Sequence, residues 1–312
     1  MASAPRRILI TGATGFVGRH LTANLASAYP EAALHTPPID VRNAEEVATA
    51  VREASPDVCV HLAAVSTVRA AEQNEQDAWD VNLHGSLRVA RAILRHAPQC
   101  QMLFASSADA YGASFRTGIP IAEGVPLAPI NAYGASKAAA DLALGSMAEQ
   151  GLRCVRLRPF NHTGPGQSDQ FVVAAFARQV ARIAAGLQPP LLQVGNINTR
   201  RDFLDVRDVC AAYLACIDRR DTLRPETILN LASGKARRIG DILSELQALA
   251  GIALEARVDP ARVREGDVLS ACGDAALAQE LLGWVPGIPW EQTLRDVLED
   301  WRARVQARRE GA

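Results

Sequence analysis

Short apolar runs alternate with amphipathic stretches along the first half of the chain. The runs, rich in Val, Ile, Leu and Cys, predict buried strands at residues 8–10, 32–34, 58–62, 101–105 and 152–157. Helical periodicity predicts helices between them, at residues 16–28, 43–54, 73–96 and 133–149. Because parallel neighbouring strands need a crossover connection, this alternation predicts an α/β fold with a doubly wound parallel sheet.

The pattern changes after residue 160. Loops rich in Gly and Pro surround a predicted helix at 169–186. A predicted helix at 206–218 and a predicted strand at 227–231 are expected to extend the first sheet. Further predicted helices lie near 239–250, 274–282 and 290–309. We therefore expect two interleaved units with a cleft at the carboxyl ends of the strands, the larger comprising residues 1–163 and about 200–232, the smaller about 164–199 and 233–312.

A glycine-rich turn follows the first predicted strand directly. Gly12, Gly15 and Gly18 form the pattern G-x-x-G-x-x-G, and the last of them lies inside the predicted helix. In such a strand–turn–helix context, glycines let backbone N–H groups approach a pyrophosphate closely. Glycine turns after strands are common, so it is the position at the first strand that predicts a dinucleotide-binding domain. The residues expected to contact the dinucleotide are Gly12, Gly15, Phe16, Val17 and Gly18.

Tyr133 and Lys137 stand four residues apart, so they share one face of a predicted helix. A nearby cation favours the phenolate form, which lets the tyrosine pass a proton at neutral pH. Only two of the 33 basic residues are lysines, so a lysine retained here indicates a role that a guanidinium does not fill. An ordinary surface helix pair is the alternative. Together with the glycine turn, the pair predicts that a nicotinamide cofactor meets a carbonyl or carbinol.

Composition argues against several classes of function. The net charge of −1 gives no basic field for nucleic acid or for an anionic membrane. The six cysteines show neither C-x-x-C nor zinc-type spacing, so no metal site is expected. No apolar stretch approaches the ~18 residues of a membrane span, and the first apolar run is too short for a signal peptide. We therefore expect a cytoplasmic protein.

Additional motifs resemble the extended short-chain dehydrogenase/reductase family over the whole chain. They are His61-Leu62-Ala63-Ala64, Asp80-Val81-Asn82 and Ser106-Ser107, beside the two patterns above. The resemblance implies a Rossmann fold in which Ser107 hydrogen-bonds the substrate oxygen and Tyr133 exchanges the proton. Lys137 would hold the nicotinamide ribose and depress the pKa of the tyrosine. Further cofactor contacts implied by the resemblance come from Asp40, Val41, Leu62, Ala63, Ala64 and Asn82.

The same resemblance bears on assembly. Family members dimerise through a four-helix bundle, which here would use the helices at 73–96 and 133–149. A homodimer is therefore expected. Ordinary burial of these small, Ala-rich faces within the monomer is the alternative.

A narrower resemblance, to GDP-4-keto-6-deoxy-D-mannose reductases, appears in the second half. It is carried by Arg158-Pro159-Phe160-Asn161-His162-Thr163-Gly164-Pro165-Gly166-Gln167, by Val194-Gly195-Asn196 and by Arg201-Asp202-Phe203-Leu204-Asp205-Val206-Arg207-Asp208-Val209. It implies that Asn161 contacts the sugar diphosphate, Arg201 the nucleotide or phosphates, and Arg264 the diphosphate. Glu265 stands where the family usually has Pro. The structural alternatives are an Arg201–Asp202 ion pair and an Asn161 that satisfies backbone groups.

The residues next to Ser107 distinguish between the reactions known in this family. Dehydratases of this family resemble one another in carrying Thr-Asp-Glu or Thr-Ser-Glu where this chain has Ser107-Ala108-Asp109. Ala108 exchanges no proton and Asp109 is one methylene short, so elimination is not expected. The resemblance implies reduction of the C4 ketone of GDP-4-keto-6-deoxy-D-mannose to a GDP-6-deoxyhexose, GDP-D-rhamnose. The alternatives are a nucleotide-sugar 4-epimerase with tightly held NAD and a non-catalytic dinucleotide sensor.

The cofactor is expected to be NADP(H), with NAD(H) also used. NAD-preferring Rossmann domains place an acid at the end of the second strand to hold the ribose 2′-hydroxyl. Here that strand reads Ala32-Ala33-Leu34-His35-Thr36, without an acid. An acid would repel the 2′-phosphate of NADP, so its absence permits NADPH, for which Arg19 and His35 are candidate partners.

Overall fold

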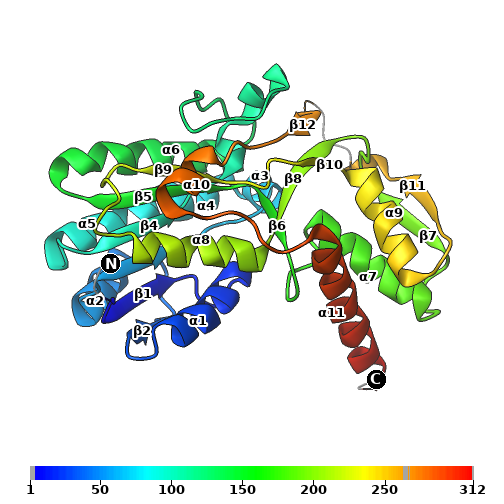
Figure 1. The fold of residues 1–312 in the computed structure, drawn as a ribbon, viewed down its shortest axis with the longest axis horizontal. Coiled ribbons are helices and arrows are strands. Elements are labelled where there is room, and N and C mark those ends of the chain that lie inside the picture. Colours follow the sequence, from blue (N-terminus) through cyan, green and yellow to red (C-terminus); the bar gives the residue numbers. More distant parts are fainter. Residues whose placement is uncertain (1–3, 263–265, 267, 311–312) are drawn as a thin grey trace.

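A six-stranded parallel sheet forms the centre of the computed structural model, which describes residues 4–262, 266 and 268–310 (Figure 1). The strand order is β2-β1-β3-β4-β5-β9, and every pairing in this sheet is parallel. The strands are β1 (Arg7–Thr11), β2 (Ala33–His35), β3 (Val58–His61), β4 (Gln101–Ala105), β5 (Arg153–Pro159) and β9 (Ile228–Leu231). The predicted doubly wound sheet is confirmed, and the order reverses between β1 and β3.

Helices cover both faces of this sheet because successive strand residues point to opposite sides. In β1, Ile8 and Ile10 pack toward α1 (Phe16–Ala28), α8 (Val206–Asp218) and α10 (Ala276–Leu282). Leu9 lies between them and packs toward α2 (Ala44–Ala54), α5 (Ser86–His96) and α6 (Ala132–Ser146). All three side chains are fully buried, which explains why the strand reads as a continuous apolar run.

The helix predicted at 73–96 is present from Glu75 to His96, but it contains a π-helical turn. The chain forms α3 (Val68–Gln73), α4 (Glu75–Ala78) and a π-helical turn (Trp79–Gly85) before α5 begins. Asn74 separates this helix from α3, because its φ of −145° is not helical and its side chain accepts a hydrogen bond from the Asp77 N–H at 3.2 Å. Asn82 lies in the π-helical turn.

The second lobe contains strands that the sequence analysis did not predict. One small sheet comprises β6 (Asn161–Thr163), β8 (Arg200–Asp205), β10 (Ala236–Arg238) and β12 (Ser270–Ala271), and a second pairs β7 (Leu191–Val194) with β11 (Glu255–Val258). The predicted helices of this lobe are present as α7 (Val172–Ala184), α9 (Ile239–Ala250) and α11 (Trp290–Glu310). Their apolar faces enclose a separate core with Phe203 of β8.

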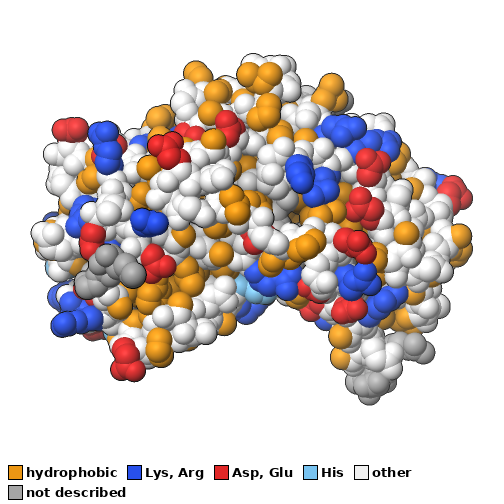
Figure 2. Space-filling model, viewed as in Figure 1, with side chains coloured by type: hydrophobic (Ala, Val, Ile, Leu, Met, Phe, Trp, Pro, Cys, Tyr) orange, Lys and Arg blue, Asp and Glu red, His pale blue; other side chains and the backbone are white. Residues whose placement is uncertain are grey.

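The two lobes interleave in sequence and in space. The α10 helix, expected in the smaller lobe, packs against β9 and α8 of the large sheet. In the space-filling view a notch separates the body of the large sheet from α11, whose carboxyl end projects away from it (Figure 2). The exact division into two domains stays a prediction. No helix in the described part of the chain is both long and apolar enough to span a membrane.

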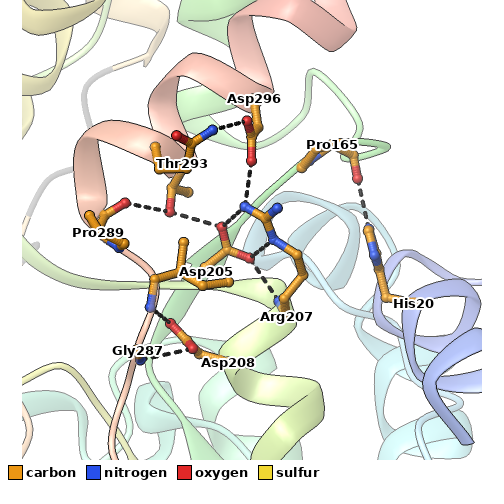
Figure 3. Close-up of polar contacts among 11 residues, drawn as sticks. His20, Pro165, Asp205, Arg207, Asp208, Gly287, Pro289, Thr293 and Asp296 are labelled. Carbon is orange, nitrogen blue, oxygen red and sulfur yellow. Dashed lines mark hydrogen bonds and ion pairs between the residues drawn. The ribbon is translucent and has the colours of Figure 1, made fainter.

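The junction of the lobes is built on the first turn of α8 (Figure 3). Asp205 caps this helix and accepts hydrogen bonds from Arg207 and, at 2.8 Å, from the Thr293 hydroxyl of α11. Arg207 also reaches Asp296 of α11 at 2.6 Å. Asp208 accepts from the backbone N–H of Gly287 at 3.0 Å. These contacts fix the start of α11 against the large sheet.

Candidate active site

The glycine turn lies at the point where the strand order reverses. Gly12 has a φ of +75°, and a Cβ added to it would lie 2.7 Å from the backbone nitrogen of Ala63, just after β3. The turn after β1 and the segment after β3 are therefore in direct backbone contact. This is the crevice in which open α/β sheets bind their ligands.

The first turn of α1 closes tightly on the same loop. A Cβ on Gly18 would lie 2.3 Å from the Gly12 carbonyl oxygen, and one on Gly15 would lie 3.1 Å from it. Gly15 caps α1 with no side-chain hydrogen bond, and the first turn carries no acidic residue. The cap therefore leaves the first N–H groups of α1 available to an anion. The cradle formed by Gly12, Gly15 and Gly18 fits a dinucleotide pyrophosphate.

Arg19 and His20 connect this helix to the loop after β6. Arg19 donates to the carbonyl oxygen of Thr14 at 2.6 Å and to that of Gly166 at 3.1 Å. His20 Nε2 lies 2.8 Å from the Pro165 carbonyl oxygen (Figure 3). The Arg19 guanidinium thus holds the glycine turn against the second lobe, so contact between Arg19 and a 2′-phosphate stays a prediction.

Asp40 and Val41 lie in the loop between β2 and α2. Arg42 donates to both Asp40 carboxylate oxygens at 3.0 and 2.8 Å and to Asp77 of α4 at 2.6 Å. The hydrogen bond from Arg42 holds the pKa of Asp40 below its ordinary value. Val41 is buried, and a Cβ on Gly85 would lie 2.7 Å from its Cγ2. The adenine-contacting role of this pair stays a prediction.

The Asn82 side chain hydrogen-bonds other residues of the protein. Its fully buried amide accepts from the Val65 N–H at 2.9 Å and donates to the Val65 carbonyl at 3.1 Å and to Ser136 Oγ at 3.0 Å. Ser136 in turn donates to the Tyr133 carbonyl at 2.9 Å. The Asn82 side chain thus anchors the first turn of α6 beside the segment after β3. The contact between Asn82 and a cofactor that the resemblance implies stays a prediction.

Ser107 and Tyr133 are brought together as the sequence predicts. Ser107 follows β4 in an extended conformation and accepts from the Asp109 N–H at 3.1 Å, which starts a short 3-10 turn. Its hydroxyl lies close enough to the phenol of Tyr133, which comes from the first turn of α6, to lower the pKa of that phenol. A proton donor and a second hydroxyl therefore stand side by side at the carboxyl ends of the strands.

The pKa of Tyr133 is not depressed, contrary to the expectation from Lys137. Burial, followed by the charge of Asp109, raises it well above the ordinary value, and the Ser107 hydrogen bond opposes this only in part. Lys137 Nζ instead donates to the Ala105 carbonyl at 2.7 Å, and burial lowers the Lys137 pKa to about 8. Tyr133 is therefore a neutral phenol at neutral pH, suited to donating a proton.

The residues expected at the sugar nucleotide lie on the strands of the second lobe. Asn161 is exposed at the start of β6, directly after β5. Arg201 of β8 donates through one nitrogen to the carbonyl oxygens of Arg200 at 2.9 Å and Val268 at 3.0 Å. Arg264 lies outside the described residues. The contacts of all three with a substrate stay predictions.

A buried charge cluster behind the site was not predicted. Asp141 of α6 is fully buried and accepts from Ser106 Oγ at 2.6 Å, from Arg158 Nε at 2.9 Å and from Arg156 at 3.2 Å. The signal was present in the sequence, because Arg156 and Arg158 alternate with apolar residues in the buried part of β5, which begins at Arg153. Two arginines on one face of a buried strand require a carboxylate opposite them.

Comparisons with known proteins place the chain in a family. A model described as "NAD dependent epimerase/dehydratase family" matches residues 8–232, which include the glycine turn, Ser107, Tyr133 and Lys137. The chain belongs to the NAD-dependent epimerase/dehydratase family.

Members of the NAD-dependent epimerase/dehydratase family resemble the chain over almost its full length. The GDP-6-deoxy-D-mannose reductase of Pseudomonas aeruginosa is 37% identical over 304 residues, 96% of this chain and 99% of that protein. The UDP-glucose 4-epimerase of Streptomyces lividans is 28% identical over 306 residues, 90% of this chain and 91% of that protein.

Solved structures of the family agree with the fold. The structure of RMD from Pseudomonas aeruginosa complexed with NADPH has a TM-score of 0.87 at 35% identity, covering 96% of this chain and 99% of that one. The UDP-glucose 4-epimerase of Thermus thermophilus complexed with NAD has a TM-score of 0.84 at 26% identity, covering 95% of this chain and 99% of that one.

Proposed function

We propose that this protein reduces the C4 ketone of GDP-4-keto-6-deoxy-D-mannose at the expense of NAD(P)H. The product would be a GDP-6-deoxyhexose, GDP-D-rhamnose. The observation that carries the proposal is a neutral Tyr133 phenol next to the Ser107 hydroxyl, with Ala108 directly after Ser107 in the chain. This set supplies one proton at one oxygen, which is what ketone reduction needs. The similarity to the Pseudomonas reductase supports the same conclusion.

The chain's own residues would act on the ketone oxygen. Ser107 donates a hydrogen bond to this oxygen and holds the carbonyl next to Tyr133. Tyr133 then gives its phenolic proton to the oxygen as negative charge develops there, a contribution of about 10²–10⁴ in rate for general acid catalysis. When bound, the nicotinamide supplies the hydride. Orientation of these groups accounts for much of the remaining acceleration.

The binding residues divide between the lobes. The cradle of Gly12, Gly15 and Gly18 would hold the cofactor pyrophosphate, and Lys137 the nicotinamide ribose. Asn161, Arg201 and Arg264 would hold the GDP diphosphate from the second lobe. Because the carboxyl end of β5 leads through Phe160 directly into β6, the sugar would lie between the two sets.

NADPH is the proposed preferred cofactor, with NADH also used. The β2 strand ends at His35, and residues 36–39 after it include no acid that would repel a 2′-phosphate; the first acid, Asp40, is paired with Arg42. The solved Pseudomonas structure contains NADPH, which agrees with this proposal.

Epimerisation is the second candidate, favoured by the similarity to UDP-glucose 4-epimerases. An epimerase returns the hydride to the opposite face of the sugar and oxidises no added cofactor. Absorbance of NADPH and of NADH should therefore be followed with GDP-4-keto-6-deoxy-D-mannose and, in parallel, with UDP-glucose, and the products identified by NMR. We expect oxidation with the GDP-keto sugar, with a higher kcat/KM for NADPH. Conversion of UDP-glucose to UDP-galactose without net oxidation would contradict the proposal.

We also propose that the protein works in the cytoplasm as a homodimer formed by the α4–α5 region and α6. Leu142, 61% exposed on α6, is the kind of apolar side chain that such a helix bundle would cover. The proposed partners are the GDP-linked sugar and a second copy of the chain, with neither nucleic acid nor membrane.

A further inference from the structure

Two successive turns of α6 hold the end of β4. Lys137 Nζ donates to the Ala105 carbonyl at 2.7 Å, and Asp141, one turn later, accepts from Ser106 Oγ at 2.6 Å. Ser107 directly follows Ser106 in the chain. Because Tyr133 lies one turn before Lys137 on the same helix, these contacts set the position of Ser107 relative to the phenol.

The Asp141 carboxylate is held rigidly from the β5 side. Arg158 donates to both of its oxygens at 2.9 Å, and Arg156 donates at 3.2 Å. Burial alone would raise the pKa of Asp141, but the hydrogen bonds and charge of Arg158, the Ser106 hydroxyl and Arg156 outweigh it, so the pKa lies below its ordinary value. The side chain is therefore a fixed negative charge behind the site, and no substrate or cofactor reaches it.

The surroundings of Lys137 leave Asp141 as its counter-charge. On α6 itself, Tyr133 is neutral at neutral pH. On β3, burial and the charge of Lys137 lower the pKa of His61 to about 3, so this ring is neutral as well. The β4 strand presents the Phe104 ring, 5.2 Å from Nζ, and a carbonyl oxygen. From β5 the arginines that face this region are those already bound to Asp141, namely Arg156 and Arg158.

We propose that Asp141 is a positioning residue for the reaction, which anchors the strand end that carries Ser107 and provides the counter-charge of Lys137. It acts through Ser106 and Lys137 and touches neither substrate nor cofactor. The inference rests on the proposed reductase function for its kinetic test, but its electrostatic part is open to a measurement that needs no substrate.

That measurement is an NMR titration of protein labelled with ¹³C at the lysine ε-carbon. The chain contains two lysines, and exposed Lys235 serves as the internal reference for Lys137. Burial lowers the pKa of Lys137 to about 8 while Asp141 opposes the decrease. In Asp141→Asn the Lys137 midpoint should fall further by about 1 pH unit, since a lost opposite charge of this kind is worth ~1–3 units. Ser106→Ala keeps the carboxylate and should leave the midpoint unchanged.

Steady-state kinetics test whether Asp141 and Ser106 hold Ser107 in position. In Asp141→Asn the high-pH limb of the kcat profile should move to lower pH together with the Lys137 midpoint. Ser106→Ala should lower kcat about tenfold with little change in KM or in that limb, because misplaced reacting groups cost up to ~10²-fold. Asp141→Glu keeps the charge with one extra methylene, so it should retain the Lys137 midpoint and lose kcat in the same way.

The results separate the possible failures. A wild-type Lys137 midpoint in folded Asp141→Asn would overturn the counter-charge. Wild-type kcat in both Ser106→Ala and Asp141→Glu would overturn the proposal that Asp141 positions Ser107 through Ser106. This kinetic test can be made even if Asp141→Asn does not fold. If the wild-type protein oxidises no NAD(P)H with the keto sugar, the proposed function fails, while the lysine titration still decides the inference.

Discussion

Replacement of Tyr133 by Phe is expected to lower kcat by about 10²–10⁴-fold, the range for loss of a general acid. The phenol is the neutral group next to Ser107, and removal of its oxygen leaves the aromatic ring in place. NADPH affinity and the thermal unfolding midpoint should therefore stay close to those of the wild-type protein. Steady-state kinetics, NADPH fluorescence titration and thermal unfolding check the three quantities.

Tyr29→Phe is the matched control for this variant. Its hydroxyl donates to Asp218 at 2.7 Å on the surface at the end of α1, far from Ser107 in the chain and outside the proposed site. The same atom is removed, and kcat should be unchanged. If Tyr133→Phe retained kcat within a few-fold of the wild-type protein, the assignment of the proton donor would be wrong.

Gly18→Ala is expected to weaken NADPH binding about tenfold or more. Its Cβ would lie 2.3 Å from the Gly12 carbonyl oxygen, so the glycine turn must move away from α1. Overpacking of this kind costs ~1–3 kcal/mol, part of which appears as lower stability and part as lost cofactor affinity. The Kd for NADPH, measured by fluorescence titration on folded protein, reports the second part.

Gly124→Ala controls for the loss of a glycine as such. Nothing lies within 4 Å of a Cβ at this position, and its φ is not in the left-handed region, so the Kd for NADPH should be unchanged. Equal Kd values for the Gly18→Ala and wild-type proteins would place the pyrophosphate away from this turn.

The large sheet was predictable because its strands are buried on both faces. Runs such as Ile8-Leu9-Ile10 carry the signal in the residues themselves, and the alternation with helices then limits the topology. Some strands of the second lobe were missed because they are short and polar, as in Ala236-Arg237-Arg238. Their pairing with β8 comes from long-range contacts that no local pattern encodes. The helix predicted at 73–96 begins two residues later than expected because Asn74 caps it, and a periodicity does not locate a cap.

Within the site, residue types were easier to predict than their electrostatics. The contact of Ser107 with Tyr133 follows from a strand end and a helix start meeting at one edge of the sheet. The sign of the Tyr133 pKa shift did not follow from its spacing to Lys137. It depends on burial and on Asp109, which only the packed structure reveals. Asp141 was overlooked because a single acid in an Ala-rich helix gives no motif, although Arg156 and Arg158 indicate that a buried carboxylate is needed.

Transfer of deuterium from [4,4-²H₂]NADPH, in which both hydrogens at C4 of the nicotinamide are replaced, to GDP-4-keto-6-deoxy-D-mannose tests the central claim most directly. Ketone reduction forms one C–D bond at sugar C4 for each NADPH oxidised, while Tyr133 supplies the proton on oxygen. We therefore predict a GDP-6-deoxyhexose with deuterium at C4 by NMR, in an amount equal to the NADP⁺ formed. Sugar interconversion with no net NADPH oxidation, or a product without deuterium at C4, would contradict the account and favour the epimerase.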